Sequence, residues 1–379
     1  MNSRSVSVLG VSNETLRVYN ALLPSHIIFT PQNTIRINIY HYAHHLSNRN
    51  RNRNRNRNRN HILYFIRRFN MDINDHINAN DITWAFKNNH ENFLRKVHLY
   101  LNKNYYKLIF NQDEEHRLND EEIYQLKQIE NIWIEHEKSE CFNKYDCYKR
   151  IKNAIDVENV LREHPAYQHS IFKYLNRQAT LDEITIFIEN EAILNVEFFD
   201  YLAYSVIGVS EQAKLEIMCN MWDKAGRGCI QLFHTMQFKK LMKGLGLKYN
   251  RERMIDKMSW EGIAGINLFS YMSIYTSNKM KYFGLLAATE MLDLPYYHQL
   301  LKGLSRENTS HTVDASYYVE HEILGVVHAH GWLNNVALPI LRQQPNKVAD
   351  FWLGFYLRLD SIQRYYDKLL KIIKSKKAA

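Results

Sequence analysis

Hydrophobic positions recur every three or four residues along most of this chain, a spacing that predicts helices. The stretch 120–164 is charged and amphipathic, and its apolar positions near helical spacing include Ile123, Leu126, Ile129 and Ile132. Farther along, Thr180 precedes Glu183 by three residues, which is the sequence signature of a capping box. We therefore expect a helix to begin after Thr180, and the pattern as a whole predicts an all-α fold.

Three polar residues interrupt the apolar faces of predicted helices. Glu290 lies among leucines and methionines in a helix that we expect to end near Pro295. Glu191 falls on or beside an apolar stripe, so it is either a buried carboxylate that needs a partner or a solvated one at the stripe's edge. His234 lies in an amphipathic run, where a lone histidine is more often a core residue than a ligand.

The segment 317–332, YYVEHEILGVVHAHGW, carries His321 and His328 seven residues apart. Seven residues make about two helical turns, so both imidazoles project from one face. Gly325 occupies that face between them, where a metal-binding helix would place a carboxylate. The flanking polar residues point about 100° or more away, and we expect them at the surface or behind the ligands: Glu320, Glu322 and His330.

Composition narrows the class of protein. The chain has 379 residues, 45% of them hydrophobic, with only 13 glycines and 6 prolines, which favours helices over an all-β fold. No apolar run is long enough for a membrane span, and no signal-peptide pattern is present at the start of the sequence. The four cysteines form no CxxC pair and no disulfide scaffold. We expect a cytoplasmic protein.

The net charge of +9 is concentrated in one segment. Residues 48–60 alternate asparagine and arginine, and their six arginines account for all but +3 of that charge. Such a segment attracts nucleic acid or anionic membranes, but a disordered, solvated loop is the better expectation. We therefore predict neither a nucleic-acid nor a membrane partner.

The sequence divides into four parts. Residues 1–47 predict no element, 48–60 form the Asn-Arg loop, 61–164 are a helical N-terminal region, and 165–372 are a helical bundle. Residues 1–160 contain no catalytic constellation, so we expect them to pack on the bundle or to mediate a subunit contact.

Three segments carry a family resemblance: KLEIMCNMWDKAGRG before His234, LLAATEML around Glu290, and YYVEHEILGVVHAHGWL. In this order and spacing they resemble the heme-oxygenase-like iron-dependent oxidases, a family of iron-containing redox enzymes, over residues 165–372. The resemblance implies a seven-helix up-and-down bundle. It also implies a non-heme iron site, usually with two irons, bound by glutamate, histidine and one aspartate.

Carried over by position, the resemblance implies five metal ligands: Glu191, His234, Glu290, His321 and His328. Glu197 is a less favoured register for the first of them. Imidazole nitrogens and carboxylate oxygens suit Fe(II) and leave positions open for O2.

Two expected ligands are replaced. Lys224 stands where the family has glutamate, and Gly325 stands where it has aspartate. An ammonium group has no lone pair to donate and repels a divalent ion. Either one iron persists, with Lys224 paired to Glu191 or Glu290 in place of the second, or the metal is lost and the fold survives as a scaffold.

Further options involve neighbouring residues. Lys224 is a candidate catalytic residue, since a desolvated lysine can act as a base or nucleophile. Asp223 or Glu216 could substitute as ligands. The resulting hypothesis is a non-heme iron oxidase or oxygenase that uses O2 on a small amino-acid-like or fatty-acid-like substrate. The alternative is a metal-depleted, non-catalytic binding protein, and a homodimer stays open in either case.

Overall fold

The structure, a computed structural model, divides the chain into two compact units, Met1–Asp75 and His76–Ala379. It describes residues 6–7, 27–29, 34–37, 78–110, 117–307 and 313–376. The predicted Asn-Arg loop at 48–60 lies outside the described residues. The predicted boundaries at 47, 60 and 164 stay predictions.

The first unit contains a small antiparallel sheet. Its strands are β1 (Val6–Ser7), β2 (Ile27–Phe29) and β3 (Thr34–Ile37), in the order β1-β3-β2. The register places Ile35 opposite both Val6 and Phe29. The sequence predicted no element here, so this sheet adds to the predicted fold.

The second unit is helical wherever it has regular structure in the described residues, which confirms the predicted all-α fold. Short 3₁₀ turns and one π-helical stretch, η7 (Trp332–Ala337), connect some of the helices. The α-helices are α3 (Ala79–Lys87), α4 (Glu91–Ile109), α5 (Asp120–Lys144), α6 (Ala154–Glu163), α7 (Ser170–Arg177), α8 (Leu181–Ser205), α9 (Glu211–Lys224), α10 (His234–Gly244), α11 (Arg251–Lys257), α12 (Trp260–Ile274), α13 (Lys279–Arg306), α14 (Ser316–Gly331), α15 (Leu338–Gln343) and α16 (Val348–Lys376).

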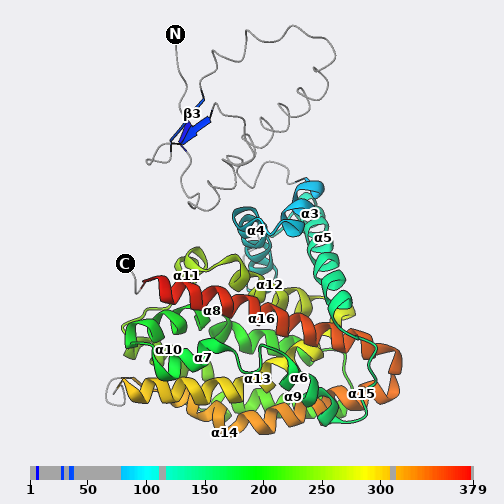
Figure 1. The fold of residues 1–379 in the computed structure, drawn as a ribbon. Helices are drawn as coiled ribbons and strands as arrows, with labels where there is room; N and C mark the ends of the chain where they lie inside the picture. The colour runs from blue at the N-terminus through cyan, green and yellow to red at the C-terminus, as the bar shows by residue number, and fades with distance from the viewer. Residues whose placement is uncertain are drawn as a thin grey trace. The chain divides into compact units, whose positions relative to one another are not determined.

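Helix α13 is the centre of the bundle. It packs against α16, α14 and α7, and the three long helices α16, α13 and α14 run side by side (Figure 1). The contact of α13 with α16 is close because both helices carry a glycine there. A Cβ on Gly284 would meet the backbone of Phe351, and one on Gly354 would meet the backbone of Lys281.

Local signals set several helix starts. The Thr180 side chain accepts a hydrogen bond from the Glu183 backbone while Glu183 reaches back, so the predicted capping box is confirmed at the start of α8. The Glu183 carboxylate also accepts a 2.7 Å hydrogen bond from Tyr174. The end predicted at Pro295 is wrong, because α13 continues through that proline to Arg306. Packing on three neighbouring helices outweighs the one backbone hydrogen bond that a proline cannot donate.

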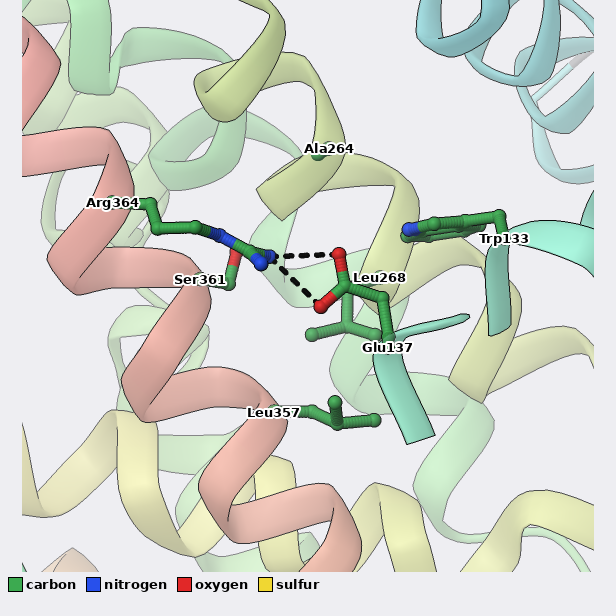
Figure 2. Close-up of a pocket in the computed structure, with 7 residues that line it drawn as sticks. All are labelled: Trp133, Glu137, Ala264, Leu268, Leu357, Ser361 and Arg364. Atoms are coloured by element: carbon green, nitrogen blue, oxygen red, sulfur yellow. Dashed lines mark hydrogen bonds and ion pairs between the residues drawn. The ribbon is translucent and has the colours of Figure 1, made fainter. Parts of the chain in front are cut away.

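The helices before the bundle pack on it through polar contacts as well as apolar ones. Asn102 of α4 donates a 2.9 Å hydrogen bond to Asn267 of α12. Figure 2 shows the Arg364 guanidinium of α16 against the Glu137 carboxylate of α5, at 2.8 and 3.0 Å. Among the described residues, no helix is both long and apolar enough to cross a membrane.

Candidate metal centre

A sharp bend between α9 and α10 places two of the candidate residues. Lys224 is the last residue of α9 and His234 is the first of α10. Between them, Gly226 and Arg227 adopt positive φ angles of 66° and 53°. A side chain on Gly226 would collide with the backbone just before His234. The glycine therefore lets the chain turn tightly enough to bring His234 back beside α9.

At the centre, Lys224 forms an ion pair with Glu290 of α13. Its Nζ lies 3.2 Å from Oε1 and 3.5 Å from Oε2, and both residues are buried. A buried charge needs a partner of opposite sign, and here each supplies the other's. Of the two partners predicted for Lys224, Glu290 is the one the structure contains.

His328 lies between two carboxylates. Its Nε2 is 3.2 Å from Asp223 Oδ2, and its Nδ1 is 3.7 Å from Glu290 Oε2. Because a carboxylate oxygen only accepts, Nε2 carries the hydrogen. Asp223 is in turn bound by Arg227 at 2.8 Å. Both nitrogens of His328 thus already face a polar partner.

His234 and His321 face each other differently. Their ring centroids are 4.4 Å apart. His321 Nδ1 donates a 2.8 Å hydrogen bond to the Tyr317 carbonyl, which leaves the lone pair on Nε2. Both ring nitrogens of the buried His234 lack a hydrogen-bond partner among the described residues, and the nearest carboxylate, Glu320, is 3.6 Å from Nε2.

All three imidazoles are held neutral. Burial lowers the pKa of His234 to about 2, assisted by the Lys224 charge. Burial also takes the pKa of His321 well below its usual range. The pKa of His328 is lowered by burial too, although the Glu290 charge opposes this shift. A neutral imidazole is the form that binds a metal.

Glu191 lies in the same region but on the wall of a polar cavity. The cavity has ≈ 30 Å³ of room for the centres of water-sized spheres, and Lys224 and His321 also line it. The Glu191 carboxylate accepts a 3.2 Å hydrogen bond from Tyr366, and burial raises its pKa to about 7. The alternative register, Glu197, is instead paired with Arg251.

The structure thus brings the sequence-predicted residues into one neighbourhood without assembling a metal site. Within the described ranges, no three His, Cys, Asp or Glu side chains are arranged to hold an ion. The two suggested substitutes are also engaged, since Asp223 binds His328 and Glu216 accepts a 2.7 Å hydrogen bond from Asn335.

The candidate ligands supply part of a site for one metal ion, and they do not supply a site for two. Lys224 holds the Glu290 carboxylate that a second ion would need, and its ammonium repels a divalent cation. The two nitrogens of His234 have no hydrogen-bond partner among the described residues, and the Tyr317 carbonyl engages only Nδ1 of the neighbouring His321, so the two rings fit the imidazole part of a single site. A carboxylate ligand would have to be recruited from Glu290 by displacing the lysine.

The sequence missed two charged residues on the cavity wall. Asp293 lies one helical turn after Glu290 on α13, and burial, followed by the Glu290 charge, raises its pKa to about 8. Arg358 is buried on α16 and faces the same cavity. The signal for Arg358 was present, because it is the only charge within the apolar run FWLGFYLRL.

Residues 185–363 match the sequence model of a family described as iron-containing redox enzymes. Two crystal structures of a CadD-like protein of unknown function from Nostoc punctiforme are similar in fold. One has 16% identity and a TM-score of 0.47, over 57% of this chain and 94% of that chain. The other has 14% identity and a TM-score of 0.45, over 58% and 93%. No curated protein matches.

Proposed function

Because residues 185–363 belong to the iron-containing redox enzyme family, we propose that this protein is a non-heme iron oxidase or oxygenase with a one-iron site. The family supports an iron-dependent oxidoreductase as the general kind of protein. Our proposal adds the use of O2, a small organic substrate, and a limit of one ion.

The observation that carries the proposal is the imidazole pair. His234 and His321 are buried, neutral and 4.4 Å apart between ring centroids, and His234 has no hydrogen-bond partner in the described part of the chain. Leaving both nitrogens of a buried imidazole unpaired costs free energy, and such a group calls for an explanation. Binding a metal through one of them would provide it. Iron held there would supply the O2 chemistry that side chains lack.

Neighbouring residues orient the imidazole pair of His234 and His321 and hold a carboxylate near it. The Tyr317 carbonyl accepts a hydrogen bond from His321 Nδ1 and so fixes the tautomer of the ring. The lone pair that can bind a metal is therefore on Nε2. Glu290 lies 3.7 Å from His328 Nδ1 of α14, and Lys224 holds its carboxylate in place by an ion pair. Lys224 lines the cavity, so its ammonium group could donate a proton to a substrate bound there.

The ion pair itself favours a second candidate function. Lys224 balances the buried charge of Glu290, so the interior needs no metal ion for charge balance. On this alternative the chain is a metal-depleted homologue that binds a small molecule or a partner and catalyses nothing. The two candidates differ in one measurable quantity, the iron content.

Elemental analysis of protein purified without oxygen and supplied with Fe(II) tests the proposal. We expect about one iron per chain, since two imidazoles and one carboxylate make a single non-heme site. A content near zero supports the metal-depleted alternative, and a content near two contradicts the limit of one ion.

The double variant Lys224→Glu with Gly325→Asp tests the ligand positions. Space for the aspartate exists, because a Cβ on Gly325 would meet only Leu294 Cδ1, at 4.0 Å. We expect this variant to bind about two irons, as restored carboxylates remove the repulsion and add ligands. Lys243→Glu, at an exposed lysine of α10, is the charge-matched control and should leave the iron content unchanged.

A further inference from the structure

Helices α9 and α14 turn a set of large apolar side chains toward solvent. Each residue of the set is at least 44% exposed. Those on α14 are Val319, Ile323, Val326 and Val327, and those on α9 are Leu215, Met218 and Trp222. Single exposed apolar residues are normal, but a group gathered on adjacent elements marks an interaction site. We call this set the apolar face.

The two parts of the apolar face adjoin because α9 and α14 lie side by side. Asp223 of α9 is 3.2 Å from His328 of α14. The helices also approach closely near the end of α14, where a Cβ on Gly331 would meet the Glu216 carboxylate. In Figure 1, α14 lies along the lower edge of the bundle. The apolar face therefore covers the outside of the two helices whose buried sides carry the candidate metal centre.

The spacing of the apolar face is that of a surface on which helices pack. Its positions on α9 follow one another at steps of three and four residues, and those on α14 include steps of four and three. Such steps place side chains on one stripe of a helix, which is the pattern of helices that pack on another helix. The opposite stripe of each helix is already buried in the bundle. The outer stripes are therefore an additional packing surface.

The area of the apolar face fits a partner of protein size. With ordinary side-chain areas, the exposed fractions leave roughly 700 Å² of apolar surface. The largest apolar patch on a typical monomer is about 300–600 Å². Each partner in a stable protein–protein interface contributes about 800 Å². The apolar face is thus larger than a monomer usually exposes and close to one half of a stable interface.

The charges around the apolar face distinguish among possible occupants. No exposed residue of α9 or α14, both described in full, is a lysine or arginine, whereas helices that bind membrane surfaces carry them. Glu211 is the only exposed acid of these two helices, so the basic segment 48–60 finds little acidic surface here. Asp223 and Arg227 neutralise each other at 2.8 Å. A neutral, apolar surface is best matched by another of its kind, and a second copy supplies one.

We propose that this chain forms a two-fold symmetric homodimer in which the apolar faces of two copies pack on each other. In such an interface both copies contribute the same surface. Trp222 is 57% exposed and is the anchor residue of the face, since buried tryptophans dominate interface energies. The dimer does not depend on the iron content, because Lys224 and His321 lie on the buried sides of the same helices.

Sedimentation velocity of the full chain at micromolar concentrations tests the proposal, and we expect a dimer. Ile323→Asp should weaken association about a hundredfold or more, because each copy must then bury an unpaired carboxylate. Leu215→Asp on α9 should act in the same way, and it serves if the first variant does not fold. Ile123→Asp is the matched control, at an exposed isoleucine of α5 away from α14 (Figure 1), and should stay dimeric.

A native cysteine reports whether the apolar face is covered. Cys219 is exposed on α9 next to Met218. In a Cys229→Ser background it is the only exposed cysteine of the chain, since Cys141 and Cys147 are buried. We expect a thiol reagent to modify Cys219 slowly in the dimer and faster when Ile323→Asp is added. An equal rate in both proteins would contradict coverage of the face by a second copy.

Three other results would overturn the proposal. A dimer that survives both Ile323→Asp and Leu215→Asp forms through a different surface. A monomer in which Cys219 reacts slowly would assign the apolar face to the N-terminal unit, and a monomer in which Cys219 reacts fast would leave the face uncovered. A monomer that sediments with phosphatidylcholine vesicles, and loses this binding with Ile323→Asp, would assign the face to a membrane.

Discussion

Single residues in this interior carry more charge than the core of an ordinary helical bundle. Lys224, Glu290 and Arg358 are all at most 7% exposed. Lys224 pairs with Glu290 and lines the same small cavity as Arg358. The sequence predicted that Lys224 pairs with Glu191 or Glu290. The family resemblance shows which ligand position holds a lysine and which positions still hold a glutamate. It could not choose between the two carboxylates, since that depends on which helices touch.

A buried histidine outside the candidate site gives a prediction at the same scale. His98 packs between Trp133 and Trp260, and burial lowers its pKa from 6.5 to about 3. Below pH 6.5 the unfolded chain takes up a proton that the folded chain refuses, so stability falls as the pH is lowered. At pH 5 this one group removes about 2 kcal/mol.

Urea unfolding near pH 7 and near pH 5 measures this loss. We expect His98→Gln to show a smaller loss than the wild type by about that amount. His330→Gln, at an exposed ring, should show the wild-type loss. An unchanged loss in His98→Gln would mean that another group is responsible.

At the scale of helices, the contact between α13 and α16 brings Asp293 and Arg358 to the wall of one cavity. Its closeness depends on Gly284 and Gly354, where any side chain would meet the backbone of the other helix. The sequence-based end of α13 at Pro295 failed for a related reason. Local propensity penalises the proline, but burial of the helix among its neighbours is a tertiary effect that no local pattern contains.

Gly354→Ala tests the close approach. We expect it to destabilise the fold by about 1–3 kcal/mol, the usual cost of forcing an extra methyl into a packed contact. Gly265→Ala on α12 is the matched control, because a Cβ there would meet only Ser361 Oγ, at 3.4 Å. The control should be neutral or slightly stabilising, as alanine favours a helix over glycine. Chemical unfolding measures the free energy of unfolding of both variants. Equal values for the two variants would contradict the close contact at Gly354.

At the scale of the whole molecule, the family match and the folded core do not coincide. The match covers residues 185–363 and begins inside α8. The hydrophobic core continues through α3 to α7 and to the end of α16, with buried members such as Leu101, Trp133 and Ile373. The sequence left open whether the N-terminal region packs on the bundle or mediates a subunit contact. It did not predict how much of the hydrophobic core these helices share with the bundle, because their apolar positions form no motif that identifies their packing partners.

Truncation tests whether the matched region is an independent fold. A chain limited to residues 185–363 loses the helices that cover α12 and the last turns of α16. We expect it to show no cooperative thermal unfolding, because the apolar faces left exposed no longer bury enough surface. A chain of residues 76–379 keeps the compact unit and should unfold in one transition. Calorimetry distinguishes the two, and a sharp transition in the shorter chain would show that the extra helices are dispensable.

The ion pair of Lys224 with Glu290 also bears on how the protein matures. A metal must be acquired from the surroundings after synthesis, whereas an ammonium group is present as soon as the chain leaves the ribosome. The interior therefore reaches charge balance at Glu290 with no delivery step. A cell starved of iron would still accumulate this chain in folded form, and its abundance would follow its own expression rather than the metal supply.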